Sequence, residues 1–269
     1  DPNQGSEGGS IACPFCNTVA DAEYVQAQGV AKRTGEQLLA VVCRRPGTRG
    51  KIYLAEKNFP KEALPDAVAI QRRIEAVCRE TGLDVPNEPI SNLRPSPNAR
   101  GLSGVTRHGY TAFGELFSVR QLLVLLTFAK WIRTIGKESA DAERAAAIAT
   151  CCGLAMDKVV SRYATFSPWD TGYEKIVLVF GKHMLPMVWD YAEAVPLENG
   201  SGGWSTALGD VIGTITTAED VSIPGNCLRA SATALPLDTP QFDAIITDPP
   251  YYDNTGTWGL LRHGDSGTR

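Results

Sequence analysis

The segment FDAIITDPPYYDN, residues 242–254, combines a short apolar run with two prolines and two tyrosines. Its apolar run AIIT is too short for a helix and predicts a buried strand. Pro249 and Pro250 then fix the backbone, carry no N–H and hold the residue before each of them extended. The Asp248 carboxylate and the Pro249 carbonyl therefore form a rigid pair of acceptors, and the ring of Tyr251 follows. In open α/β sheets, ligands bind at this edge, beyond the carboxyl ends of the strands.

Two acceptors beside a stacking ring suit a planar group that bears an NH₂, such as the exocyclic amine of a nucleobase. Asp248-Pro249-Pro250-Tyr251 resembles motif IV of the amino-methyltransferases, which methylate that amine on adenine or cytosine with S-adenosylmethionine. The resemblance implies that Asp248 and Pro249 accept hydrogen bonds from the amine and localise its lone pair towards the methyl donor. It also implies that Tyr251 stacks on a base taken out of the duplex. A proline-rich turn that closes a strand is the purely structural alternative.

The segment Gly225–Leu237 precedes this motif at the spacing typical of such enzymes. Many relatives have an Asp in it that binds the adenine of the cofactor, and Ser231 occupies the matching place here. The resemblance therefore implies a weaker, uncharged cofactor contact at Ser231. The alternative interpretation is that Ser231 is a helix N-cap.

Two further segments indicate a particular group within these enzymes: Cys13-Pro-Phe-Cys16 and Met187-Val-Trp-Asp-Tyr-Ala-Glu193. With the extended motif IV, they resemble the large prokaryotic adenine-specific DNA methylases that carry a zinc ribbon (the DUF1156-associated group), over residues 10–254. The implied fold is α/β: a partial Rossmann-like methyltransferase core with a small zinc-ribbon-like β module and a helical insertion. The implied activity is S-adenosylmethionine-dependent methyl transfer to the exocyclic amine of adenine in DNA.

Cys13-x-x-Cys16 has the spacing of a zinc knuckle, but a ribbon needs a second pair, and the sequence has none at that spacing. Two alternatives stay open: zinc ligands in a parent protein, or free thiols. We expect this chain alone not to hold zinc tightly. The 7 cysteines, an odd and unevenly spaced set, argue against a secreted disulfide framework and for a reducing, cytoplasmic compartment. Four of them are expected to be buried small apolar residues: Cys78, Cys151, Cys152 and Cys227.

Composition excludes some classes of protein. The chain is 43% apolar and 21% charged, with no apolar run long enough to span a bilayer. Its net charge of −4 argues against a general polyanion binder, although residues 1–110 carry 14 Lys and Arg against 12 Asp and Glu. Basic residues cluster between Lys32 and Lys51, where they could contact phosphates or form a solvated face. A non-catalytic nucleic-acid-binding or scaffold subunit is therefore the rival function, and an enzyme acting on cytosine or RNA is another.

Three regions are expected: a zinc-ribbon-like module (1–58), a helical insertion and linker (59–172), and the C-terminal part of the methyltransferase core (173–269). The expected short strands lie near residues 11–16, 24–28, 37–43, 51–55 and 176–180. The expected helices are 67–80, 118–135, 140–165 and 183–194. The glycine-rich stretch 198–209 is interpreted as a plain surface loop, because a helix rather than a strand is expected before it.

The glycine-rich turn that normally grips the methionine end of the cofactor is not visible in the sequence. The chain is therefore expected to be an internal piece of an enzyme. We expect residues 1–269 alone to bind S-adenosylmethionine weakly or not at all and to show no turnover.

Overall fold

The computed structural model describes most of the chain between residues 9 and 247. The described residues are 9–13, 15–47, 50–60, 64–92, 104–138, 141–181, 185–221, 223, 225, 228–231, 234–236 and 243–247.

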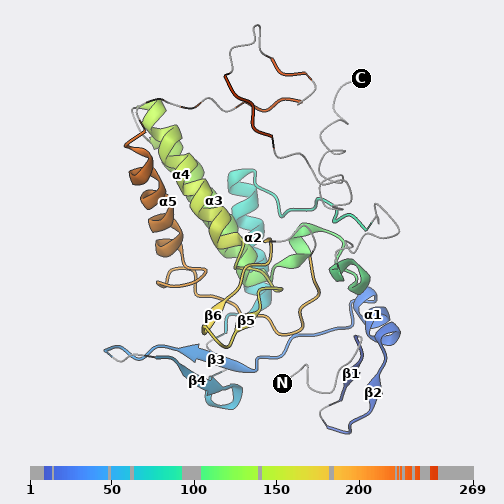
Figure 1. Ribbon diagram of the computed structural model, residues 1–269. Helices are drawn as coiled ribbons and strands as arrows, with labels where there is room; N and C mark the ends of the chain where they lie inside the picture. Colours follow the sequence, from blue (N-terminus) through green and yellow to red (C-terminus); the bar gives the residue numbers. More distant parts are fainter. Residues whose placement is uncertain are drawn as a thin grey trace.

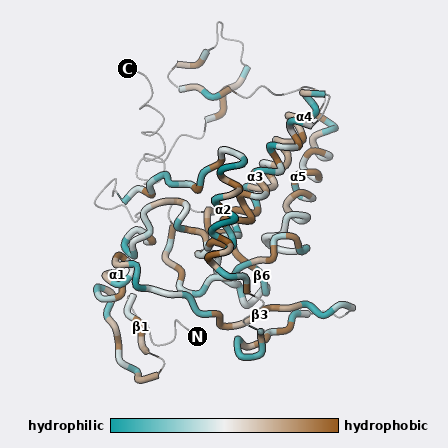
Figure 2. The backbone as a smooth tube through the Cα atoms, turned by 180° about the vertical axis from the view of Figure 1, so that it is seen from behind, coloured by the Kyte–Doolittle hydropathy of each residue, from teal (hydrophilic) through white to brown (hydrophobic). Residues whose placement is uncertain are grey.

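Four helices form the main packing unit (Figure 1). They are α2 (Ala67–Thr81), α3 (Val119–Glu138), α4 (Ala142–Val160) and α5 (Trp204–Ala218). In chain order each packs against the next, α2 on α3, α3 on α4 and α4 on α5. Figure 2 shows the apolar stretches of α3 lying among these neighbours.

Capping side chains mark where the helices begin and end. The Asp66 carboxylate accepts a hydrogen bond from Ala69 N at 2.9 Å and starts α2, and Gly82 ends it in the left-handed conformation with φ +66°. Ser118 and Gln121 cap α3 reciprocally, since each backbone N–H donates to the other's side chain, at 2.9 and 3.2 Å. The predicted helices at 67–80, 118–135 and 140–165 are confirmed, although α4 ends five residues early.

Two apolar clusters hold the helices together. Ile70 and Ile74 of α2 pack against Leu126 of α3. The second cluster joins α3, α4 and α5, and its buried members are Leu125, Ala155, Val159, Tyr163, Ala207 and Val211. Burying a side chain of the Val or Leu class contributes about 1.5–3 kcal/mol. This burial explains why α5 is helical although its sequence, WSTALGDVIGTITTA, is rich in glycine and β-branched residues.

The strands of the described part form three separate antiparallel pairs. They are β1 (Ile11–Ala12) with β2 (Val19–Ala20), β3 (Ala40–Cys43) with β4 (Ile52–Ala55), and β5 (Trp169–Asp170) with β6 (Lys175–Ile176). The predicted strands near 37–43 and 51–55 are confirmed by β3 and β4, which pair from Ala40–Ala55 to Cys43–Ile52. The Rossmann-like core, whose sheet is parallel, stays a prediction.

Short helical segments link the N-terminal region to the rest of the chain. They are α1 (Ala22–Val30), η1 (Glu56–Asn58), η3 (Gly104–His108) and η4 (Phe113–Leu116). The strand predicted at 24–28 is wrong, because Asp21 caps a helix there by accepting from Tyr24 N at 2.7 Å. α1 contacts η3, and Lys32 donates to the Gly109 carbonyl at 2.6 Å and to Glu115 at 2.8 Å.

The helix predicted at 183–194 is wrong over the part that the structure describes. Residues 185–194 are irregular, and Tyr191 forms an isolated antiparallel bridge with Pro168. The Ala192 N–H donates to the Ser167 carbonyl at 2.8 Å. Backbone groups that an α-helix would use internally are here bonded to a distant segment. The predicted strand 176–180 is reduced to its first residue, in β6.

Candidate functional site

The four residues with the predicted base chemistry, Asp248, Pro249, Pro250 and Tyr251, lie outside the described residues. The apolar run before them, residues 244–247, is described. It is irregular and exposed, and the Ile246 side chain is 96% exposed. The prediction of a buried strand is therefore wrong. The physical reason is that a strand needs a neighbouring strand for its backbone hydrogen bonds, and no described segment pairs with this run.

Ser231, the predicted cofactor contact, is exposed and forms an isolated bridge with Ala234. The Ala234 N–H donates to the Ser231 carbonyl at 3.0 Å. No helix begins among the described residues that follow, 234–236 and 243–247, so the N-cap alternative is wrong there. A contact between Ser231 and a cofactor stays a prediction.

The two predicted metal ligands lie on one tight turn. Cys13 and Cys16 belong to the connection between β1 and β2. The Cys13 N–H donates to the Thr18 carbonyl at 2.9 Å, and the Asn17 N–H donates back to the Cys13 carbonyl at 2.9 Å. Asn17 takes a positive φ of 58°, which closes the turn. The hairpin therefore brings both cysteines into one small region, as a zinc knuckle does.

The electrostatics of this turn favour the thiolate form of Cys16. The Thr18 hydroxyl, 3.3 Å from Cys16 Sγ, lowers the pKa of the thiol, as do the Thr18 backbone and the Cys13 side chain. Thiolates are the form of cysteine that binds metals and attacks electrophiles. The described residues contain no group of three or more His, Cys, Asp or Glu that could hold a metal ion. Within that part of the chain, the hairpin could therefore supply at most two of the four ligands that structural zinc takes.

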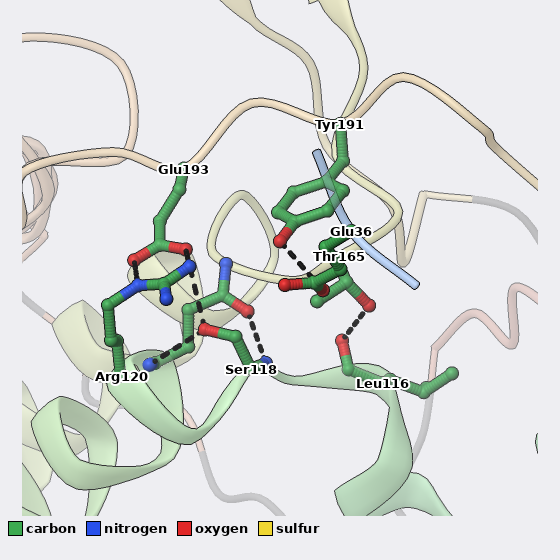
Figure 3. Close-up of polar contacts among 8 residues, drawn as sticks. Glu36, Leu116, Ser118, Arg120, Thr165, Tyr191 and Glu193 are labelled. Carbon is green, nitrogen blue, oxygen red and sulfur yellow. Dashed lines mark hydrogen bonds and ion pairs between the residues drawn. The ribbon is translucent and has the colours of Figure 1, made fainter. Parts of the chain in front are cut away.

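A second polar cluster surrounds Met187–Glu193, one of the segments that carry the family resemblance (Figure 3). The Arg120 guanidinium on the first turn of α3 donates to both Glu193 oxygens, Nε to Oε1 at 2.9 Å and Nη2 to Oε2 at 2.8 Å. The Ser118 hydroxyl donates to the same carboxylate at 3.4 Å. The Tyr191 hydroxyl donates to Glu36 at 2.9 Å.

The charges of this cluster fix a chain segment in place and are not suited to proton transfer. Hydrogen bonds from Arg120 to Glu193 raise the pKa of the guanidinium. Burial, followed by the Glu36 carboxylate, raises the pKa of the Tyr191 phenol. Both groups keep their protons near neutral pH, so neither can act as a general base. The cluster instead fixes the segment 187–193 against the start of α3 and against Glu36.

One buried donor in the cluster is unsatisfied. Gln121 is fully buried, and its carboxamide oxygen accepts from the Ser118 N–H. Its Nε2 has no hydrogen-bond partner among the described residues. A buried unpaired amide costs about 1–3 kcal/mol. The packing of the cluster must outweigh that cost.

Sequence reasoning missed this cluster for an identifiable reason. Ser118-x-x-Gln121 is a capping-box pattern, and it could have located the start of α3. The Arg120–Glu193 pair joins positions 73 residues apart and carries no local signal.

Comparison of the chain with protein-family models, with curated proteins and with solved structures finds no match. Among the described helices, none combines the length and the apolar character that a membrane span requires.

Proposed function

We propose that this chain is part of an S-adenosylmethionine-dependent methyltransferase that acts on the exocyclic amine of adenine in DNA. The observation that carries the proposal is the sequence Asp248-Pro249-Pro250-Tyr251. A delocalised amine is a poor nucleophile, and two rigid acceptors localise its lone pair where the methyl group arrives. The backbone of this tetrapeptide is restricted by the two prolines, so the acceptors are positioned before the base binds.

Two further features support the proposal. Cys13 and Cys16 share one hairpin turn, as the zinc-ribbon resemblance requires of a knuckle. In a complete ribbon these thiolates would hold zinc as a structural ion. The segment Met187–Glu193 is fixed by an ion pair and a bridge, which suits a connector between a helical insertion and a core. The proposed regions remain 1–58, 59–172 and 173–269.

The decisive experiment replaces Asp248. The full-length parent protein, of which this chain is the proposed part, would be expressed in cells that lack DNA methyltransferases, and methylated bases would be profiled in DNA and in RNA. We expect N6-methyladenine in DNA with the natural sequence and none with Asp248→Ala, because the amine loses its charged acceptor. Asp243→Ala, at an exposed position five residues earlier, is the matched control and should leave methylation unchanged.

Full methylation by the Asp248→Ala variant would contradict the assignment of that residue. Methylcytosine in DNA, or methylation confined to RNA, would replace adenine in DNA as the substrate. No methylation together with salt-dependent DNA binding would favour a non-catalytic nucleic-acid-binding subunit.

A further inference from the structure

A cavity of about 390 Å³ opens where the end of α4, β6 and the segment before α5 meet. This volume lies in the range of small-ligand pockets. Three of its lining side chains are cationic, Lys158, Arg162 and Lys175, and one is a carboxylate, Asp210. The backbone of Gly200–Gly203 forms another wall.

The positive charge of this cavity is only partly neutralised. Lys158 Nζ pairs with Asp210 Oδ2 at 2.6 Å. Arg162 is partly buried, and its guanidinium has no ion pair or side-chain hydrogen bond with any described residue. Lys175 stands over the exposed ring of Tyr173, 4.8 Å from its centroid, and has no carboxylate partner in the described part of the chain. Two of the cationic residues that line the cavity, Arg162 and Lys175, therefore have no carboxylate partner among the described residues.

The glycine-rich wall has a defined conformation. The structure corrects the interpretation of residues 198–209 as a plain surface loop, because α5 begins at Trp204 and no helix lies directly before the glycines. The backbone of Gly203 packs against the Glu198 carbonyl so closely that a β-carbon would not fit. The Ser201 hydroxyl donates to the Ile176 carbonyl at 2.7 Å and ties the wall to β6.

The β3–β4 hairpin lies beside β5 and β6 in Figure 1, and its turn carries two more cationic residues, Arg44 and Lys51. Arg44 Nη1 donates to the Asn199 carbonyl at 3.2 Å, directly before the glycines. Lys51 stands 4.9 Å from the centroid of Trp169 in β5. A hollow of about 270 Å³ beside it is lined by Arg44, Gly50, Lys51 and Glu174. The Glu174 carboxylate there accepts from the Tyr53 hydroxyl at 2.8 Å.

We propose that the cavity binds a phosphate group through Arg162 and Lys175, and that Arg44 and Lys51 contact neighbouring phosphates of a nucleic-acid backbone. A guanidinium presents a planar fork of donors that matches phosphate oxygens, and an ammonium adds a point charge. A row of cations extending over several elements fits successive phosphates better than a single small anion. The site does not depend on the proposed methyl transfer, since phosphate binding and base chemistry involve different residues.

The test uses the whole 269-residue chain. Binding to a fluorescent DNA duplex would be followed by anisotropy at several salt concentrations, and binding of inorganic pyrophosphate by calorimetry. Arg162→Gln should weaken duplex binding by about tenfold and reduce the slope of log affinity against log salt by about one. Lys175→Gln, at an exposed position, should act in the same direction. Arg72→Gln, on the exposed side of α2, removes the same charge elsewhere and should change neither quantity.

The duplex and pyrophosphate measurements together show whether the bound phosphate belongs to a nucleic acid or to a small ligand. Duplex binding that depends on Arg162 and Lys175 supports a nucleic-acid backbone. Pyrophosphate binding that depends on them, without duplex binding, supports the same site with a free phosphorylated ligand. Three outcomes would overturn the proposal. The first is that Arg162→Gln and Lys175→Gln bind both ligands as well as the natural chain, and the second is that Arg72→Gln weakens duplex binding equally. The third is that the natural chain binds neither ligand. Circular dichroism of each variant separates loss of binding from loss of folding, and base-methylation profiles test the enzymatic proposal separately.

Discussion

Arg120, on the first turn of α3, holds Glu193 in a two-hydrogen-bond ion pair across 73 residues of sequence. Both side chains are less than one third exposed, at 32% and 24%. The pair fixes the irregular segment 187–193 to the helical layer, so we expect it to contribute to the stability of the whole fold.

Replacing Glu193 with Gln should lower the free energy of unfolding by about 1–2 kcal/mol, because a partly buried guanidinium loses its charged partner. Urea denaturation followed by circular dichroism would measure the change. Glu80→Gln is the matched control: Glu80 is 60% exposed in its ion pair with Lys130, so its loss should cost less than about 1 kcal/mol. Equal losses in the two variants would contradict a structural role for the Arg120–Glu193 pair.

The stability of the chain should fall in acid partly through Glu115. Burial acts to raise its pKa, but hydrogen bonds from Lys32, Thr111 N and Ala112 N outweigh burial and lower the pKa from 4.5 to about 2. Since the pKa is lower in the folded state, the contribution of Glu115 is complete above pH 4.5 and disappears as the pH falls towards 2.

Between pH 5 and pH 3, the Glu115→Gln variant should therefore lose less stability than the natural chain. The difference in stability between the two proteins should be largest at neutral pH. Thermal unfolding at pH 7, 5 and 3 would measure the difference. A gap that stays constant over this interval would show that Glu115 titrates alike in the folded and unfolded states.

The thiol of Cys16 should react faster than the other described cysteines. It is exposed, and the Thr18 hydroxyl lowers its pKa, whereas Cys152 is buried and burial raises the pKa of its thiol. Timed alkylation with iodoacetamide and peptide mass spectrometry would rank the rates. Thr18→Val should slow the reaction at Cys16, and Thr18→Ser, which keeps the hydroxyl, should not. Equal rates in the two variants would contradict the role of the hydroxyl.

Gly29 fixes how closely α1 approaches η3. A β-carbon at this position would lie 2.6 Å from the His108 carbonyl oxygen, which is too short for any real contact. Gly29→Ala should therefore separate α1 from η3 and lower stability by about 1–3 kcal/mol.

Gly153 provides the control for this substitution. It lies inside α4, and a β-carbon there would meet no atom within 4 Å. Gly153→Ala should instead stabilise the chain by about 0.5–1 kcal/mol, since alanine is the better helix former. Calorimetric melting of both variants would show opposite shifts, and shifts of the same sign would contradict the close approach of α1 and η3.

Elements with local signals can be predicted from the amino-acid sequence. α2 follows from its apolar spacing, from the Asp66 N-cap and from Gly82 at its end, all within 17 residues. The β3–β4 hairpin follows from two short apolar segments separated by turn residues. The structure places Cys13 and Cys16 on one turn, and zinc binding by this pair stays a prediction. The predictions of α2 and of the β3–β4 hairpin are confirmed because helix caps and short hairpins are formed by hydrogen bonds between near neighbours.

The conformation of segments with distant partners depends on tertiary contacts. Residues 185–194 have a helical pattern but are irregular: the Ala192 N–H donates to the Ser167 carbonyl, and Glu36 and Arg120 bind the side chains of Tyr191 and Glu193. The glycine-rich stretch 198–209 predicts a loop, yet α5 begins inside it at Trp204, because burial of Ala207 and Val211 in the α3–α4–α5 cluster stabilises a helix. The cationic cavity joins residues of α4, β6 and the glycine-rich segment, and no single stretch of sequence contains it. In each case the deciding energy comes from contacts between positions far apart in the chain, and local periodicity does not record such contacts.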